Sequence, residues 1–309
     1  MTLQQLKYIV ALDYKRHYVK AAEECFVTQP TLTIQVKKLE EEIGTIIFDR
    51  NSIPLTPTPI GEILIAKAKV ILREAEEFEE LASNNASNLS GQYTLGIIPT
   101  IAPYLLPLFL ENFLKNNPKT KLVIKEIQTK HIINSLHNGT LDIGIVSTPL
   151  EDKMIREIYL YQEPFLVYCK DKNEFSSSEI VKQDDLTPDE LLLLEEGHCF
   201  RNQVLNICKE NKTLKNKTFL FESGSIQTIK NLVKKGLGYT LVPQLSICEK
   251  EEKNHLKHFE EPKPSREISM VVNNNFTKER LIENLLLEIK NILPKEVTDI
   301  NNYIKIRWK

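Results

Sequence analysis

A long stretch of helix-forming residues divides this chain into two unequal parts. The stretch opens at Thr58, a good N-cap, with Pro59 in the first helical position, and it continues to about Asn84. The segment "SNNASNLSG" (83–91) then has the composition of a linker. We therefore expect a small N-terminal module and a larger C-terminal part, which suits a length of 309 residues.

The apolar residues of this long helix form a narrow stripe. Their spacing alternates between four and three residues, as in the a/d seam of a two-helix coiled coil. The stripe consists of Leu64, Ala68, Ile71, Ala75 and Phe78. The C-terminal half of the helix is rich in glutamates, so the apolar stripe is the main surface available for burial. The pattern favours a dimerisation helix, and the alternative is a helix that packs on its own domain.

The residues before this helix predict a winged helix-turn-helix. Thr28 is a good N-cap, Pro30 is tolerated in the first turn, and apolar residues recur at helical spacing until Gly44. A shorter helix precedes this one across a turn. The segments "TIIFDR" (45–50) and "IPLTP" (53–57) read as two short strands around a turn, which gives the wing.

The second helix of such a motif enters the major groove of DNA. The side chains expected at base edges are Gln29, Thr31, Thr33 and Gln35, and those expected at phosphates are Lys37, Lys38 and Arg50. Pro30, in the first turn of the same helix, is also assigned to the DNA-binding surface. Residues 1–60 hold seven basic and seven acidic side chains, so charge alone does not favour DNA. The alternative is a three-helix bundle with a solvated polar face.

Beyond the linker, predicted strands alternate with predicted helices. Strands are expected at 92–99, 121–127, 141–146, 164–170, 190–196, 217–223, 238–243 and 267–272, with helices at 104–116, up to 136, at 225–235 and at 277–292. This alternation predicts parallel α/β sheets with right-handed crossovers. We expect two lobes with a cleft between them, formed by residues 91–163 plus 268–309 and by residues 164–267. The last fifteen residues have no strong pattern and predict a poorly packed tail.

Composition bounds the class of protein. The chain is 41% hydrophobic and 27% charged, with a net charge of −2, which is ordinary for a globular protein. No apolar run reaches the roughly 18 residues of a membrane-spanning helix, and the N-terminus lacks the pattern of a secretory signal. We therefore expect a cytoplasmic protein without a membrane partner. In that reducing compartment a disulfide is usually transient.

Two of the five cysteines lie close together in "EEGHCFRNQVLNICKEN" (195–211), where His198 precedes Cys199, Arg201 follows, and Cys208 comes nine positions later. Peroxide reacts with a thiolate, and an unperturbed cysteine has a pKa of about 8.5. His198 and Arg201 are placed to stabilise that anion. The alternatives are two inert thiols or a zinc site, although a Cys-x-x-Cys spacing is absent. We assign no function to the three other cysteines.

Helical geometry would separate these two cysteines. If residues 201–208 are helical, nine residues at about 1.5 Å each place the two Cα atoms roughly 13 Å apart. A disulfide tolerates no more than about 7 Å. A bond between Cys199 and Cys208 would therefore require the helix to unwind.

The N-terminal sequence resembles a known family. "AAEECFVTQPTLTIQVKKLEEEIGTIIFDR" (21–50) is similar to the winged helix-turn-helix of the LysR-type transcriptional regulators, and the chain after Gly91 resembles their effector domain, which is related in fold to periplasmic binding proteins. The resemblance implies a DNA-binding domain at 1–58, a dimerisation helix and hinge at 59–90, and a regulatory domain at 91–309. It also implies homodimers, homotetramers, promoter DNA and RNA polymerase as partners. Ile34 and the pair Ile53–Pro54 stand where many relatives have basic residues.

Within this family the cysteine segment resembles the OxyR branch of peroxide sensors. The matching residues are Gly197, His198, Cys199, Arg201, Gln203 and Cys208. "IIPTIAPYLLP", "EIQT", "LDIGIV" and "PKPSREI" are similar as well. The resemblance implies that Cys199 is peroxidatic and Cys208 resolving, that Arg266 joins them, and that Thr100 and Thr129 hold the peroxide oxygens.

The same resemblance implies a regulator rather than an enzyme, with no cofactor or metal, and a glutaredoxin or thioredoxin as reductant. Two other functions compete with it. One is a LysR-type regulator that responds to a small metabolite bound between the lobes. The other is a thiol peroxidase, which the helix-turn-helix argues against.

Overall fold

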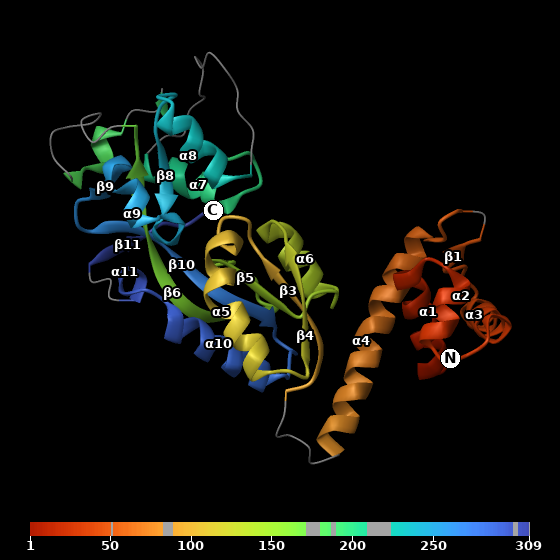
Figure 1. The fold of residues 1–309 in the computed structure, drawn as a ribbon. Helices are drawn as coiled ribbons and strands as arrows, with labels where there is room; N and C mark the ends of the chain where they lie inside the picture. The colour runs from red at the N-terminus through yellow and green to blue at the C-terminus, as the bar shows by residue number, and fades with distance from the viewer. Residues whose placement is uncertain are drawn as a thin grey trace. The chain divides into compact units, whose positions relative to one another are not determined.

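A computed structural model describes residues 1–50, 52–82, 89–170, 180–186, 190–208, 224–298 and 302–308 (Figure 1). The chain divides into two compact units. The first is Met1–Asn88 with His137–Thr140, and the second is Leu89–Leu136 with Leu141–Lys309. The expected strand at 217–223 lies outside the described residues.

The first unit contains the expected helix-turn-helix. Its helices are α1 (Leu3–Lys15), α2 (Tyr18–Glu24) and α3 (Gln29–Ile43). Helix α3 begins after Thr28, whose Oγ1 accepts a hydrogen bond from the backbone N–H of Thr31, and it ends at Gly44 with a φ of 68°. Leu32, Val36 and Leu39 face the core of the unit.

A buried carboxylate fixes the wing to α3. The wing consists of β1 (Phe48–Asp49) and β2 (Thr56–Pro57), which pair antiparallel. Glu40 of α3 accepts hydrogen bonds from the backbone N–H groups of Ile47 and Phe48 at 2.8 and 3.2 Å, and from Arg50 at 2.6 Å. One side chain therefore holds both the backbone at the start of the wing and the arginine that follows it.

Helix α4 (Pro59–Ala82) packs partly on its own unit. Ile65, Ala68 and Leu72 are buried in the core of that unit, so the expectation that Ala68 belongs to a seam for a partner is wrong. Ile71 and Phe78 remain exposed, the latter by 76%. Ile60 and Ile63 are exposed as well. The exposed apolar face of α4 thus keeps Ile71 and Phe78 of the predicted stripe and adds Ile60 and Ile63.

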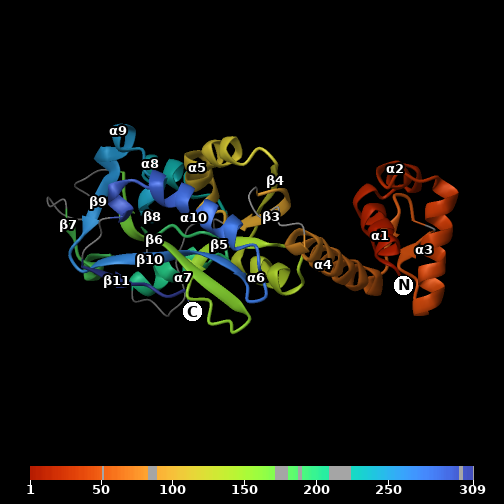
Figure 2. The same ribbon diagram turned by 90° about the horizontal axis from the view of Figure 1, so that it is seen from below.

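The second unit is built on a mixed sheet (Figures 1 and 2). Its strands among the described residues are β3 (Gly91–Ile97), β4 (Thr120–Glu126), β5 (Ile143–Thr148), β6 (Ile155–Tyr168), β7 (Ile180–Val181), β8 (Thr240–Pro243), β9 (Leu256–Phe259), β10 (Lys263–Asn273) and β11 (Tyr303–Lys305). The strand order is β4-β3-β5-β10-β6-β9-β7, with β8 on β6 and β11 on β10. Strand β3 runs parallel to β4 and β5, whereas β10 runs antiparallel to β5 and β6. The expectation of purely parallel sheets is therefore wrong.

Helices cover this sheet. They are α5 (Ala102–Asn116), α6 (Thr129–His137), α7 (Cys199–Ile207), α8 (Ile226–Lys234), α9 (Glu249–Glu252), α10 (Glu279–Ile292) and α11 (Lys295–Thr298). Helices α5 and α10 contact each other, as Figure 1 shows. The segment expected as a strand at 190–196 forms only an isolated bridge, between Leu191 and Tyr239. None of the described helices is both long and apolar enough to cross a bilayer.

The second unit has two hydrophobic cores. One gathers residues of β3, β5, α5, α6 and α10, and the other gathers residues of β8, α7, α8 and 191–194. Strand β6 contributes to both, with Tyr161 in the first core and Phe165 in the second. Cys199 packs in the first core, although the next residue, Phe200, packs in the second. Helix α7 therefore begins at the junction of the two cores.

The C-terminal segment is ordered against the sheet. Strand β11 pairs parallel with Lys263, Pro264 and Ser265 of β10, and Trp308 Nε1 donates to the carbonyl of Pro149 at 3.0 Å. The expectation of a poorly packed tail is therefore wrong. The side chains of β11 are exposed, so backbone pairing rather than an apolar face holds this strand.

Candidate functional site

Cys199 is the first residue of α7, and its side chain is buried with 5% of the residue exposed. The hydroxyl of Thr129, the first residue of α6, donates to Cys199 Sγ at 3.6 Å. The backbone N–H groups of Cys199 and Phe200, at the N-terminus of α7, also favour a thiolate at this sulfur. The sulfur therefore lies between the N-terminal ends of two helices.

Arg266 of β10 supplies the positive charge next to this sulfur. It is 1% exposed, and its Nε donates to Glu163 Oε2 at 2.8 Å. Its Nη1 donates to Thr100 Oγ1 at 2.9 Å, and its Nη2 donates to the carbonyl of Thr100 at 3.1 Å. The guanidinium carbon lies 5.2 Å from the ring centroid of Phe200. The structure thus brings Arg266 and Thr100 together beneath the first turn of α7.

Glu163 is a site residue that sequence reasoning missed. It is buried in β6, and besides Arg266 it accepts a hydrogen bond from the backbone N–H of Leu245 at 3.0 Å. Its signal in the sequence is a charged residue within the apolar run "YLYQEPFLVY" (159–168). A carboxylate in such a strand needs a buried cation or several donors, because burying a lone charge is costly.

The opposing influences on Cys199 can be ranked. Burial raises the pKa of the Cys199 thiol and is the largest effect. The Thr129 hydroxyl, the charge of Arg266 and the two backbone N–H groups lower that pKa, but the pKa remains above its ordinary value. The thiol is therefore mostly protonated near neutral pH, and its polar neighbours limit the cost of forming the thiolate.

Two residues expected beside the sulfur make other contacts. His198 is buried, and its Nε2 lies 3.3 Å from Glu195 Oε1. Arg201 Nη1 donates to the carbonyl of Leu194 at 2.8 Å. The guanidinium whose charge acts on Cys199 is that of Arg266 rather than that of Arg201.

A groove of about 630 Å³ opens next to this site. Its lining includes Tyr104, Gln128, His131, Glu195 and His198. Gly197 allows the chain to pass close to Gln128, because its φ is 93° and an added Cβ would lie 2.8 Å from the Gln128 side chain. The groove is large enough for a small molecule.

Cys208 lies at the opposite end of α7 from Cys199. It is the C-cap of the helix, is buried, and packs in the second core. The expectation of a helix between the cysteines is therefore confirmed, and all five cysteines are thiols. Nine residues of helix place the two Cα atoms roughly 13 Å apart, beyond the reach of a disulfide.

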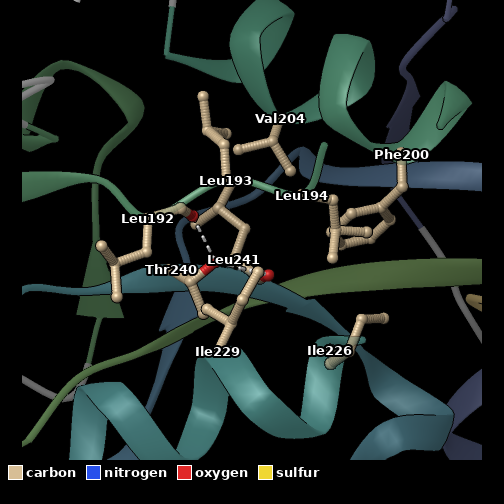
Figure 3. Close-up of a pocket in the computed structure, with 9 residues that line it drawn as sticks. All are labelled: Leu192, Leu193, Leu194, Phe200, Val204, Ile226, Ile229, Thr240 and Leu241. Atoms are coloured by element: carbon tan, nitrogen blue, oxygen red, sulfur yellow. Dashed lines mark hydrogen bonds between the residues drawn. The ribbon is translucent and has the colours of Figure 1, made fainter. Parts of the chain in front are cut away.

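Apolar packing holds α7 in this position. Figure 3 shows Phe200 and Val204 of α7 facing Ile226 and Ile229 of α8 across a pocket in the second core. The segment Leu192–Leu194 closes the pocket, and the Thr240 hydroxyl fixes it by donating to the carbonyl of Leu192 at 2.8 Å. Unwinding α7 would remove its apolar side chains from this core.

Several of the side chains expected at base edges have partners inside the first unit. The Thr31 and Thr28 hydroxyls hydrogen-bond each other at 2.8 Å, and the Thr33 hydroxyl donates to the carbonyl of Gln29 at 2.9 Å. Gln35 accepts from Gln5 Nε2 at 3.2 Å. Gln29 and Pro30 are exposed at the start of α3.

The basic residues of this face differ in their availability. Lys37 lies 3.5 Å from Glu41, and because both side chains are exposed this ion pair is weak. Arg50 forms an ion pair with the buried Glu40. Lys38 is exposed. Ile34, 63% exposed, lies among these outward residues of α3. The exposed surface of α3 therefore combines these lysines with the apolar side chain of Ile34.

Among the described residues no group of three or more His, Cys, Asp or Glu side chains gathers in a metal-binding arrangement. Nothing in that part of the chain favours the zinc alternative.

Two family models match the chain. "Bacterial regulatory helix-turn-helix protein, lysR family" matches residues 3–62, and "LysR substrate binding domain" matches residues 86–291. The chain therefore belongs to the LysR family of bacterial transcriptional regulators, and the predicted fold class is confirmed.

Within this family the chain is similar to OxyR proteins. It is 34% identical over 273 residues to the "Hydrogen peroxide-inducible genes activator" of Pectobacterium carotovorum subsp. carotovorum, covering 88% of this chain and 90% of that protein. It is equally identical to the "DNA-binding transcriptional dual regulator OxyR" of Escherichia coli K12, covering 89% of that protein.

Solved structures give the same result. A full-length OxyR variant from Pseudomonas aeruginosa is 33% identical, with a TM-score of 0.79 over 95% of this chain and 99% of that one. A hydrogen-peroxide-bound OxyR mutant from Corynebacterium glutamicum is 30% identical, with a TM-score of 0.61 over 94% of this chain and 92% of that one.

Replacing Thr129 by valine should raise the pKa of Cys199 further, because the substitution removes a hydroxyl donor to the sulfur without changing the volume of the side chain. We expect alkylation of Cys199 at neutral pH to slow by about tenfold, because a smaller fraction of the thiol is then ionised. Alkylation rates at several pH values, read by peptide mass, measure this change. Thr129→Ser keeps the donor and serves as the control, and equal rates in the two variants would contradict the assignment.

Proposed function

We propose that this protein is a hydrogen-peroxide-sensing transcriptional regulator in which Cys199 is oxidised and then bonds to Cys208. The observation that carries the proposal is the position of these thiols at opposite ends of one buried helix, with the first beside Thr129 and Arg266. The relatives named as hydrogen peroxide-inducible activators support it.

The first chemical step oxidises Cys199. Its thiolate attacks one oxygen of hydrogen peroxide, an S–O bond forms, the O–O bond breaks, and the second oxygen leaves as hydroxide that takes up a proton to become water. The hydroxyls of Thr100 and Thr129 orient the two peroxide oxygens, and Arg266 stabilises the charge that moves to the leaving oxygen. The product is a sulfenic acid.

The second step closes the disulfide. The Cys208 thiolate attacks the Cys199 sulfur, an S–S bond forms, the S–O bond breaks, and the sulfenic oxygen leaves as hydroxide that takes up a proton to become water. One peroxide thus accepts the two electrons that the two thiols give up. A glutaredoxin or thioredoxin dithiol returns Cys199 and Cys208 to thiols by thiol–disulfide exchange and is itself oxidised to a disulfide. In this proposal the cycle serves to switch a regulator and not to convert a substrate.

Disulfide closure changes the surface of the regulatory domain. The two Cα atoms must approach from roughly 13 Å to below about 7 Å, so α7 must unwind and its apolar side chains must leave the second core. In the cytoplasm, homodimers formed through α4 and homotetramers formed by pairing of regulatory domains would transmit this change to promoter DNA and RNA polymerase.

A second candidate function rests on the groove of about 630 Å³. Its mixed lining, with His131 and Glu195 among apolar residues, suits a small metabolite. In that case the chain would be a LysR-type regulator that needs no cysteine chemistry.

Substoichiometric hydrogen peroxide followed by disulfide mapping separates these functions. We expect a bond between Cys199 and Cys208 and a changed footprint on promoter DNA, both lost in Cys199→Ser. Cys248→Ser, which alters an exposed cysteine, should behave as the wild type. A wild-type protein without the bond and with an unchanged footprint would favour the metabolite regulator. Sustained peroxide consumption with a thiol donor, in a protein that does not bind DNA, would indicate a peroxidase.

The rate of the peroxide reaction should depend on pH. Because the pKa of Cys199 is raised, the thiolate fraction increases about tenfold for each pH unit throughout the neutral range. Stopped-flow rate constants should therefore climb across about pH 6 to 8 with a slope near that value. A plateau beginning below about pH 7 would show that the reacting thiol has a lowered pKa.

The lysines of α3 should set the salt dependence of DNA binding. Replacing both Lys37 and Lys38 by alanine leaves two phosphates without a neutralising charge at each subunit, so the slope of log K against log salt should become shallower by about 0.9 for each such phosphate. Lys7→Ala alters an exposed lysine of α1 and is the matched control. Fluorescence anisotropy on one promoter fragment measures the slopes. Equal slopes for the double variant and for Lys7→Ala would exclude Lys37 and Lys38 from the interface.

A further inference from the structure

Three side-chain amides of α7 donate to three consecutive carbonyl groups near the C-terminus. The bonds run from Asn202 Nδ2 to Trp308 O at 3.1 Å, from Gln203 Nε2 to Ile306 O at 3.0 Å, and from Asn206 Nδ2 to Arg307 O at 2.8 Å. The three donors lie between Cys199 and Cys208 on the same helix. We call these three side chains and the segment 306–308 the clamp.

The segment that accepts these bonds is itself fastened to the sheet. The backbone N–H of Ile306 donates to the carbonyl of Ser265 at 2.8 Å, one residue before Arg266, and Trp308 Nε1 donates to the carbonyl of Pro149. Gln203 Nε2 also donates to Ser147 Oγ of β5 at 3.0 Å. The clamp therefore ties the middle of α7 to β5 and β10.

The clamp requires a helical α7. Asn202 and Asn206 are four residues apart, so their side chains lie on one face of the helix, one turn from each other. Neighbouring carbonyls of an extended segment can meet both amides only while that spacing holds. Unwinding the helix to bring Cys208 to Cys199 would break these bonds.

We infer that Asn202, Gln203 and Asn206, bound to residues 306–308, keep α7 helical and so limit the rate at which Cys208 captures an oxidised Cys199. They are positioning residues, because their hydrogen bonds go to the C-terminal segment and to Ser147 rather than to either sulfur. The inference rests on the proposed function. It also gives the C-terminal segment, which carries no apolar pattern, a role in the timing of the response.

The clamp should affect the rate of disulfide closure but not the rate of Cys199 oxidation. Oxidation happens at the N-terminus of α7, next to Thr129 and Arg266, and needs no unwinding. Disulfide closure needs the helix to open. Weakening the clamp should therefore leave the first rate constant unchanged and raise the second. Since Asn202 and Asn206 are exposed to water, each bond contributes modestly, and we expect a combined effect of about three- to tenfold.

The test uses a single pulse of hydrogen peroxide on the full-length protein. Sulfenic acid at Cys199, trapped by a dione reagent, and the Cys199–Cys208 disulfide are followed by mass over time. In the double variant Asn202→Ala, Asn206→Ala, sulfenic acid should form at the wild-type rate and the disulfide should form about three- to tenfold faster. A tenfold gain in the oxidised form at equilibrium would make the reduction potential more negative by about 30 mV.

A second variant tests the other half of the clamp. Ending the chain after Asn302 removes the acceptors and should accelerate closure similarly. Adding the double substitution to the truncated chain should change nothing further, because the truncation already removes the carbonyls to which Asn202 and Asn206 donate. The matched control is Asn231→Ala, which removes an exposed asparagine of α8 whose partner is Gln227. Unchanged closure in the double variant, or fully additive effects, would overturn the inference.

Failure of the proposed function gives a different result. If wild-type Cys199 forms no sulfenic acid, the sensing proposal fails. Hydrogen exchange of the reduced protein then tests whether the clamp stabilises helix α7. The backbone amides of α7 should then exchange faster in the double variant than in the wild type or in Asn231→Ala. Equal protection in all three proteins would overturn the clamp as well.

Discussion

The buried pair of Arg266 and Glu163 is the interaction on which the site depends. It joins β10 to β6, and through Thr100 it joins both strands to the start of α5. Removing one partner of such a pair costs about 3–5 kcal/mol, because the other charge is left buried and uncompensated. The pair therefore has two roles. It connects β6, which contributes to both cores, to β10, and it presents a fixed positive charge to the first turn of α7.

Helix α7 lies between two sets of interactions that differ in kind. At its first residue, polar groups act on the Cys199 sulfur against the effect of burial. Along the rest of the helix, Phe200, Val204 and Ile207 fill the second core. Loss of this packing is the main energetic cost of unwinding, at about 1.5–3 kcal/mol for each large side chain exposed.

Local signals predicted much of the fold but not its long-range pairings. Thr28 and Gly44 mark the ends of α3 because capping is a local property. The first half of β6 was missed because Pro164 reads as the start of a strand, whereas it pairs with Ser265 inside the sheet. The ion pair of Glu163 and Arg266 spans 103 residues, and no spacing rule connects them. The C-terminal strand has exposed side chains, so hydrophobic periodicity could not reveal it.

Strands β6 and β10 run side by side through the second unit, with β6 entering both of its cores. In a two-lobed receptor joined by thin crossovers, a ligand can act by bending the connection. Here β6 itself passes from the first core into the second, and its pairing with β10 as far as Pro164 stiffens the connection because several backbone hydrogen bonds would have to shift together. In such a scaffold a signal has to change the structure locally. The surface around one helix is rearranged while the sheet keeps its geometry. Neighbouring subunits would then sense altered contours and not an altered hinge angle.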